Sequence, residues 1–189
     1  MQKDSLLARL RSFFFREKPV RYVRFRDGMG NFELFYPQGW KFDEDIAVVD
    51  GKYTISFVSG NGLCQFTIAV DAQLPESFAF TKYAKAELES PTSGIYTPMK
   101  KATFHSMPAY ERDYSYSSGG RSYFGGGVMF CTGDAVFSLS WSAPEAERKR
   151  MDAVFSHMRK TLAVRAGFVI TRMRGRVPGM DATRRMEDT

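Results

Sequence analysis

The side chains that could carry acid–base chemistry are few. Imidazole is the group that titrates near neutral pH, and the 189-residue chain has two histidines, His105 and His157. His105 lies in a predicted loop with Glu111 and Asp113 nearby, an arrangement that imitates an acid–base cluster. However, Glu111 and Asp113 share a strand face opposite Tyr110, so we interpret them as two carboxylates on a solvated face. His157 is expected in the last helix, off its apolar stripe.

The sequence contains no recognisable motif for nucleophilic catalysis, metal binding or phosphate binding. The chain has no GxSxG elbow, and neither Cys64 nor Cys131 has an obvious histidine partner. Neither cysteine sits in a CxxC pair, so we expect two free thiols on strands. The glycines at 125–127 lack the Lys-Ser/Thr of a P-loop and predict a bulge or a close backbone approach, for which a ligand is one candidate. We expect no catalytic residue, no metal site and no cofactor.

An aromatic and polar cluster is the best candidate for binding. Tyr110, Arg112, Tyr114 and Tyr116 alternate along one predicted strand face, and Tyr123 lies across the next turn. Tyrosine and arginine serve as binding anchors because they combine a large contact area with a polar tip. The alternative is a sheet face covered by a helix, with the tyrosine hydroxyls reaching solvent at its rim. We take these five residues as candidate binding residues.

The net charge of +6 is concentrated at the two ends of the chain. Residues 1–26 hold eight Lys/Arg against two acidic residues, and residues 163–189 hold six Arg against three, whereas residues 27–162 have a net charge of −3. Basic ends suggest an acidic partner, either a membrane surface, a nucleic acid or a protein, although they could simply be solubilising tails. The tyrosines lie in the acidic middle, away from the basic residues, so nucleic-acid binding is not expected.

Residues 4–17 have the pattern of a basic amphipathic helix, which Pro19 ends. Its apolar stripe is Leu6, Leu7, Leu10, Phe13 and Phe14. The stripe could lie on a membrane, bind a partner or dock on its own domain, and Arg9, Arg11 and Arg16 are candidate residues for contact with an acidic surface. Arg9 and Arg11 interrupt the apolar residues, so no signal peptide is expected, and no apolar run approaches the roughly 20 residues of a membrane span. We expect a cytoplasmic protein, with peripheral membrane contact as an alternative.

The pattern of predicted strands and helices favours an α+β fold, in which an antiparallel meandering sheet is sandwiched by helices. We expect residues 1–26 to form the basic helix and an edge segment, residues 27–162 the folded domain, and residues 163–189 a basic tail. Asp50-Gly51 and Asn61-Gly62 predict hairpins. The later elements are expected to be a helix between Pro75 and Pro91, strands at about 95–104, 108–117, 121–131 and 134–141, and a final helix that begins with a capping box at Ser142–Glu145.

Two stretches of sequence resemble the PsbP-like and Mog1-like domain family. They are Tyr36-Pro37-Gln38-Gly39-Trp40, at the end of an early strand, and the run from Gly133 to Glu145, which includes Trp141 and leads into the last helix. The resemblance covers residues 31–162. It implies a central antiparallel sheet between helices, with structural roles for Tyr36, Pro37, Gly39, Trp40 and Trp141, and it brings no metal site.

The resemblance also implies a class of function. Members of this family include extrinsic photosystem subunits, a binder of a nuclear-transport GTPase, secreted lipoproteins and effector chaperones, and most are accessory or adaptor proteins. The chain departs from the lumenal and lipoprotein members because it has no recognisable signal or transit peptide. We therefore expect a non-catalytic accessory or adaptor protein that binds a protein partner or complex. The alternatives are a small-ligand or lipid-binding carrier and, less favoured, an uncharacterised hydrolase.

Overall fold

The computed structural model describes residues 19–49, 52–72, 74, 78–88, 94–133 and 135–165, with the backbone alone for residues 44–49. The basic helix expected over residues 4–17, with Arg9, Arg11 and Arg16, lies outside the described residues, as do the turn at 50–51 and the tail beyond residue 165.

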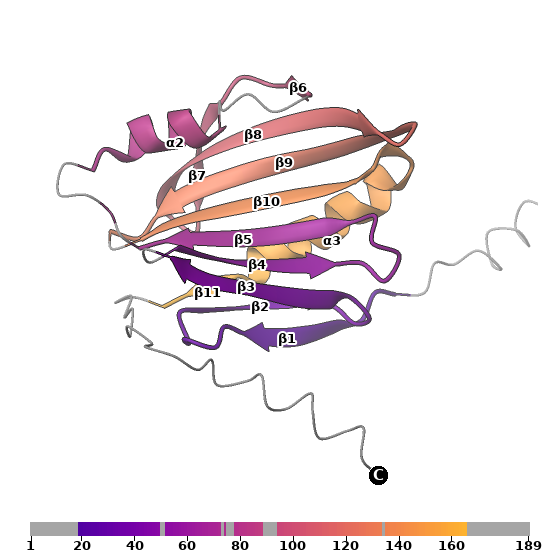
Figure 1. Cartoon of the computed structure of the whole chain (residues 1–189), viewed down its shortest axis with the longest axis horizontal. Coiled ribbons are helices and arrows are strands. Elements are labelled where there is room, and N and C mark those ends of the chain that lie inside the picture. Colours follow the sequence, from indigo (N-terminus) through magenta and orange to yellow (C-terminus); the bar gives the residue numbers. More distant parts are fainter. Residues whose placement is uncertain are drawn as a thin grey trace, which may run out of the picture.

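The larger of two sheets has eight strands, and every paired neighbour in it is antiparallel. Its order is β3-β4-β5-β10-β9-β8-β6, with β7 also paired to β8 (Figure 1). The strands are β3 (Lys41–Val49), β4 (Lys52–Val58), β5 (Gln65–Asp71), β6 (Ile95–Tyr96), β7 (Lys100–Phe104), β8 (Met107–Ser118), β9 (Arg121–Cys131) and β10 (Val136–Pro144). The strand expected over 95–104 is therefore two short strands, because residues 97–99 leave the ladder between them.

A second sheet of three strands has the order β1-β2-β11, where the sequence predicted one sheet only. Its strands are β1 (Tyr22–Arg26), β2 (Phe32–Pro37) and β11 (Ala163–Val164). Strands β1 and β2 form a hairpin in which Phe25 pairs with Leu34 and both side chains are buried. Strand β11 follows the last helix and pairs with Glu33 and Phe32. A two-residue strand is too short to show a period of two, which is why the sequence pattern missed it.

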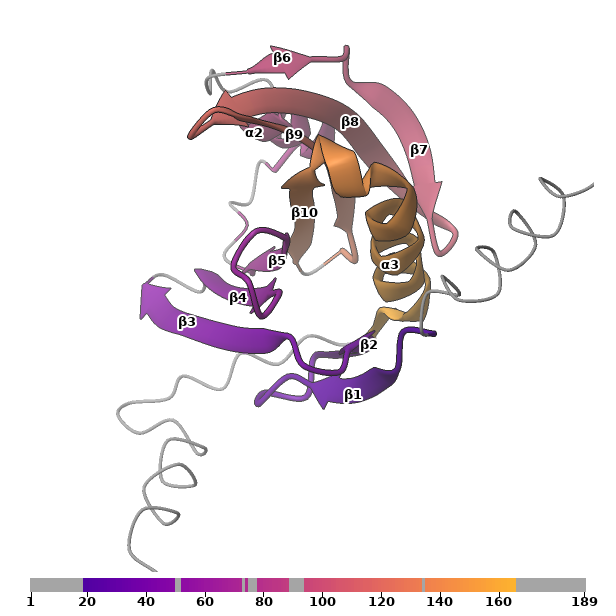
Figure 2. The same cartoon turned by 90° about the vertical axis from the view of Figure 1, so that its right-hand side faces the viewer.

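Two helices cover opposite faces of the large sheet, which confirms the α+β class and an antiparallel sheet between helices. In Figure 2 the large sheet curves around α3 (Arg148–Thr161). The other helix, α2 (Phe80–Leu88), packs on the opposite face, against Tyr110 and Met129. The capping box predicted at Ser142–Glu145 is wrong. Strand β10 stays paired with β9 as far as Pro144, a 3-10 turn follows at Glu145–Glu147, and α3 begins without a side-chain cap.

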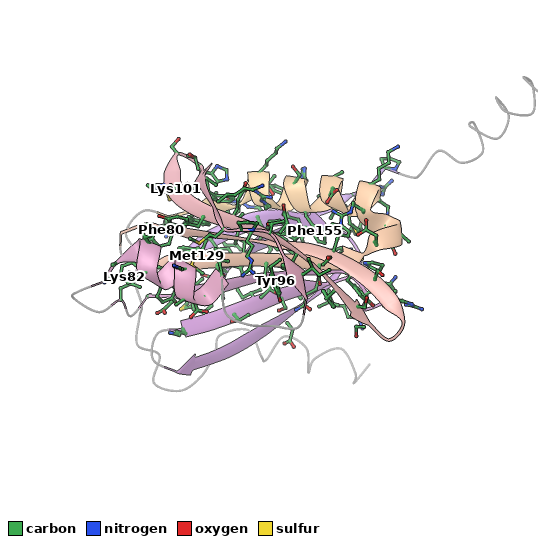
Figure 3. All side chains as sticks on the ribbon, turned by 90° about the horizontal axis from the view of Figure 1, so that it is seen from above. Phe80, Lys82, Tyr96, Lys101, Met129 and Phe155 are labelled. Atoms are coloured by element: carbon green, nitrogen blue, oxygen red, sulfur yellow. The ribbon has the colours of Figure 1, made fainter. Side chains whose placement is uncertain are left out.

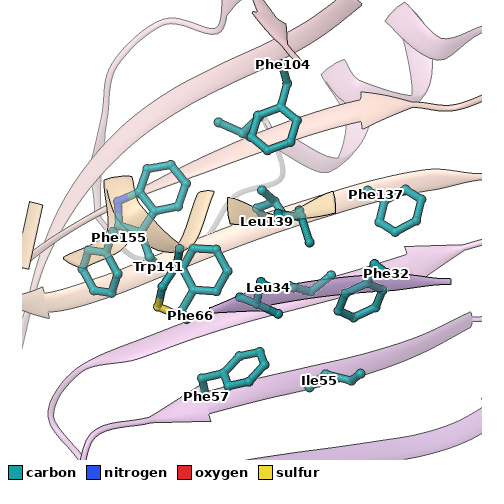
Figure 4. Close-up of a cluster of buried hydrophobic side chains, with 14 of the residues drawn as sticks. Phe32, Leu34, Ile55, Phe57, Phe66, Phe104, Phe137, Leu139, Trp141 and Phe155 are labelled. Carbon is teal, nitrogen blue, oxygen red and sulfur yellow. The ribbon is translucent and has the colours of Figure 1, made fainter. Parts of the chain in front are cut away.

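The core fills the space between the concave face of the large sheet, the small sheet and α3 (Figure 4). Alternate residues of the strands supply it, as a period of two requires. Its largest fully buried side chains include Phe57, Phe66, Phe130, Phe137 and Phe155. Each such side chain contributes about 1.5–3 kcal/mol relative to exposure, so this layer is the main source of stability.

The Tyr36–Trp40 segment joins the two sheets. Pro37 is buried, and Gly39 has a positive φ of 90° that a side chain would strain. The Trp40 N–H donates a 3.1 Å hydrogen bond to the Pro37 carbonyl, and the half-buried Trp40 ring lies 6.3 Å from that of Phe155. Tyr36 packs 5.0 Å from the ring of Phe57. The turn therefore holds β2 against both the large sheet and α3.

Candidate functional site

A groove of about 450 Å³ runs along the outer face of the large sheet beyond the C-terminal end of α2. Leu88 of α2 and Tyr96 of β6 line its sides, together with tyrosines of β8. Gly127 of β9 and Ser138 and Ser140 of β10 also line it. We call this hollow the tyrosine groove. Figure 3 views the molecule from the side of α2 and labels Tyr96.

Four tyrosines form a row of neighbouring rings that begins in this groove. Tyr96 and Tyr114 have ring centroids 5.8 Å apart, and Tyr114 and Tyr116 are 6.2 Å apart. Tyr116 stacks on Tyr123 at 5.0 Å with an interplanar angle of 9°. All four rings are partly exposed. The row offers aromatic faces and phenol hydroxyls to a bound molecule, the combination that anchors many interfaces.

Arg112 lies at the Tyr96 end of this row. Its guanidinium carbon is 4.0 Å from the centroid of the Tyr96 ring, and its Nε donates a 3.0 Å hydrogen bond to the Thr97 carbonyl. Its Nη1 is buried and has no hydrogen-bond partner among the described residues. An unpaired buried guanidinium nitrogen is costly, because charged donors are normally satisfied. The tyrosine groove therefore holds a donor that an acceptor on a bound molecule would satisfy.

Tyr114 is fixed in place by the strand beside it. Its hydroxyl donates a 2.8 Å hydrogen bond to the Trp141 carbonyl. Burial raises the pKa of Tyr114 to about 12, and the neighbouring Tyr116 and Tyr96 act in the same direction. The phenol is therefore neutral at physiological pH and serves as a donor.

The glycines at 125–127 form no bulge, since they pair in unbroken register with both β8 and β10. The predicted close approach does occur, but the chain's own aromatic rings make it. A Cβ on Gly125 would lie 2.5 Å from the Tyr114 ring, and one on Gly126 would lie 2.5 Å from the Trp141 ring. Gly127 differs, because the nearest atom to its Cβ position is Leu88 Cδ2 at 3.4 Å. The missing side chain at Gly127 helps to leave the groove open.

The sequence grouped Tyr110 with the candidate binding residues, but the structure places it beneath α2. It shares the strand face of Arg112 and Tyr114 but is only 8% exposed, because α2 covers it. Its hydroxyl is 2.8 Å from Thr81 Oγ1, and its ring is 5.4 Å from that of Phe80. Tyr110 therefore fixes α2 to the sheet, as in the helix-covered alternative. The remaining residues of the cluster extend beyond the end of that helix.

A second hollow of about 530 Å³ lies on the other face of the large sheet, beside α3. Arg148 and Arg159 of α3 lie over the rings of Phe124 and Trp141, at 4.2 and 4.6 Å. Burial lowers the pKa of Arg159, although Glu111 and Asp113 oppose the shift. Asp113 lines this hollow. Glu111 and Asp113 thus face the α3 side near arginines, where the sequence suggested a merely solvated strand face.

The histidines and cysteines have structural surroundings. His105, in a turn with a φ of 46°, places its Nε2 3.2 Å from the Arg159 carbonyl oxygen. His157 stacks on Tyr22 with ring centroids 3.8 Å apart. Cys64 and Cys131 are both free thiols, and burial raises the pKa of Cys64. None of these four side chains lines the tyrosine groove.

No group of three or more His, Cys, Asp or Glu side chains in the described part of the chain is placed to hold a metal ion. Neither described helix has the length and apolar character needed to cross a bilayer.

The polar and aromatic groove residues that sequence reasoning missed include Tyr96, Ser138 and Ser140. The serines had a usable signal, since Ser138, Ser140 and Ser142 alternate with buried residues and so predict a polar outer face for β10. Tyr96 gave no such signal, because it lies in a two-residue strand and its neighbours show no clear alternation of polar and apolar side chains. Its place beside Arg112 depends on the tertiary fold.

No protein-family model and no curated protein sequence matches the chain. In three dimensions it is similar to cyanobacterial PsbP (CyanoP) from Synechocystis sp. PCC 6803, with a TM-score of 0.56 and 12% identity over 79% of this chain and 96% of that chain. The Ran-binding protein Mog1p of Saccharomyces cerevisiae gives a TM-score of 0.49 and 10% identity over 77% and 96% of the two chains.

A third structure, LpqN, which is involved in cell envelope biogenesis of Mycobacterium tuberculosis, gives a TM-score of 0.46 and 13% identity over 81% of this chain and 95% of that chain. The match to CyanoP covers nearly the whole of that protein. The described part of this chain therefore has the Mog1/PsbP-like fold.

Proposed function

We propose that this chain is a non-catalytic binding module that holds a segment of a protein partner in the tyrosine groove. The observation that carries the proposal is Arg112, whose Nη1 has no hydrogen-bond partner among the described residues and whose guanidinium lies against Tyr96, at one end of a row of partly exposed tyrosines. A polypeptide supplies what this groove requires, namely carbonyl acceptors for the guanidinium and apolar side chains for the rings. Aromatic residues and arginine at the centre of an interface often contribute most of its binding energy.

The shape of the groove also suits a protein segment. Its floor is regular sheet, with small residues at Gly127, Ser138 and Ser140. Small residues on a rigid floor allow a chain to approach the sheet closely, while the tyrosine hydroxyls and serines offer hydrogen bonds. This arrangement needs no group that changes protonation near neutral pH, which agrees with a binding role.

The alternative function is the carriage of a small ligand. The volume of about 450 Å³ supports it, since small-molecule sites commonly occupy about 300–1,000 Å³. Native mass spectrometry of the purified chain separates the two functions. A bound small molecule that is lost when Gly127 is replaced by Phe would favour the carrier, whereas the unliganded mass is expected for the protein-binding module.

Site-specific photocrosslinking tests the proposed function. A photoreactive phenylalanine analogue placed at Tyr116 should crosslink the chain to a discrete protein in the native host. The same analogue at two exposed positions that do not line the groove should give no such product. These positions are Ser122, near the start of β9, and Thr103 on β7. Crosslinks of equal yield from all three positions would contradict a binding surface at the groove.

A further inference from the structure

The outer face of the small sheet is strongly basic. Strand β1 exposes Arg24 and Arg26, and Arg165 follows β11. Nitrogens of Arg26 and Arg165 lie 3.8 and 3.9 Å from the position of a Cβ on Gly30, so the two guanidinium groups converge there. With Arg24 they line a hollow of about 320 Å³. We call Arg24, Arg26 and Arg165 the arginine face.

Most of this charge is not compensated. Arg24 forms an ion pair with Glu33 on the neighbouring strand, with Nη2 2.5 Å from Oε2. Within the described ranges, Arg26 and Arg165 form no ion pair. Among the described residues that line this hollow, Glu33 is the one carboxylate, and it is paired with Arg24. Arg26 and Arg165 therefore repel one another, and an external anionic surface would relieve that repulsion.

Both ends of the chain join the fold at this sheet. The chain enters β1 at Tyr22 and leaves β11 at Val164. Residues 1–18 carry five Lys/Arg against two acidic residues, and residues 166–189 carry five Arg against three. Positive charge from the two ends of the sequence is therefore attached to the same layer of the fold.

Apolar side chains on the same layer indicate the kind of anionic surface. Phe35 pairs directly across from Arg24 and is 40% exposed, and Val20 is 40% exposed just before β1. The sequence then continues toward its start through residues 4–17, where apolar residues and arginines recur at helical spacing. Arginines beside exposed apolar side chains suit the boundary between lipid headgroups and acyl chains, whereas an acidic protein surface offers no such apolar layer.

We propose that the arginine face docks the protein on an anionic lipid bilayer. This inference goes beyond the proposed function and does not depend on it. In Figures 1 and 2 the small sheet lies at one end of the molecule, while β6, β8 and α2, which border the tyrosine groove, lie at the other end. A bilayer bound at the arginine face leaves the groove open, so the protein can hold a partner while it lies on a membrane.

Vesicle sedimentation with the full chain tests the proposal. Vesicles that contain phosphatidylserine should bind the protein, vesicles of phosphatidylcholine alone should not, and binding should weaken as salt rises. The triple variant Arg24→Ala, Arg26→Ala and Arg165→Ala should lower the partition coefficient by about 100-fold, because each arginine near an anionic surface contributes about fivefold. A control variant removes three exposed charges elsewhere, with Lys82→Ala, Lys85→Ala and Arg121→Ala.

The control variant should bind the vesicles within about threefold of the unchanged chain. Two of its three charges lie on α2, at the opposite end of the molecule from the small sheet (Figure 1), and salt screens charges separated by more than a Debye length of about 10 Å. Equal losses in the two variants would overturn the arginine face, since net charge alone would then explain the binding. A chain that binds an acidic polypeptide such as poly-glutamate but not phosphatidylserine vesicles would overturn the bilayer as its partner. A melting curve of each variant confirms that the fold is kept.

Discussion

The ring of Tyr114 lies against the backbone of Gly125, so that a Cβ on this glycine would come 2.5 Å from the ring. The phenol can cross to the Trp141 carbonyl on β10 only because β9 has no side chain there. This pair fixes the Tyr114 ring against the sheet, and it explains why a glycine is required at position 125 in the middle of a buried strand.

Gly125→Ala should therefore be strongly destabilising. The new methyl group would collide with both the Tyr114 ring and the Trp141 backbone, and overpacking of this kind costs about 1–3 kcal/mol or more. Gly127→Ala is the matched control, because its Cβ would meet Leu88 Cδ2 at 3.4 Å and the Leu139 carbonyl oxygen at 3.7 Å, both ordinary contact distances. Urea unfolding of both variants measures the difference. Equal losses of stability would show that the Tyr114–Gly125 contact does not control the packing of this strand.

The stability of the protein should fall in alkali, in part because of Tyr114. Its pKa in the folded state is about 12, above the ordinary value of 10.0. Between these values the unfolded chain releases the proton that the folded chain keeps, so the free energy of unfolding falls as pH rises. Below about pH 10 the contribution is constant. Tyr114→Phe should flatten this fall, as measured by urea unfolding from pH 9 to pH 11.5. An unchanged slope would mean that the phenol is not held as described.

The two tryptophans should differ in their contribution to stability. Trp141 is 8% exposed and stacks on Phe66, so Trp141→Ala should cost about 3–5 kcal/mol. Trp40 is half-buried at the edge of α3, so Trp40→Ala should cost less, about 2–3 kcal/mol. Thermal melts give the ranking. A melt of the Trp40 variant within a degree of the unchanged protein would instead identify Trp40 as a surface residue available for binding.

Removal of residues 1–18 should weaken binding to anionic vesicles and leave the melting temperature unchanged. The deleted residues carry Lys3, Arg9, Arg11, Arg16 and Lys18. The loss should be largest at low salt, where these charges are least screened. A fall of several degrees in the melting temperature would show instead that the apolar stripe packs on the folded domain, because about 1 kcal/mol corresponds to roughly 2–4 °C at this size.

Local patterns in the sequence predicted much of the fold. The Asn61-Gly62 turn was predicted, and Gly62 adopts a φ of 72° there. The apolar stripe of the last helix was also predicted, and Met151, Val154, Phe155 and Met158 are buried. Each of these features depends on neighbouring residues alone. The division into two sheets was not predictable in this way, since it depends on Val164 meeting Phe32 more than a hundred residues away.

The candidate site, too, could be predicted only where it depends on neighbouring residues in the sequence. Arg112, Tyr114 and Tyr116 were selected from their alternation, and all three line the tyrosine groove. Tyr110 follows the same alternation but is covered, because strand periodicity assigns a face and does not show where a helix on that face ends. The boundary between the buried and open parts of the row is set by the end of α2 at Leu88, which packs near Gly127.

The most direct test of the central claim is the affinity of the crosslinked partner, once identified, for three purified forms of the chain. Gly127→Phe should fill the tyrosine groove and weaken binding at least tenfold without lowering the melting temperature by more than a few degrees. Ser118→Phe, at an exposed position on the same hairpin, should bind like the unchanged chain. Undiminished affinity of the Gly127→Phe variant would contradict the proposal that this protein binds its partner in the tyrosine groove.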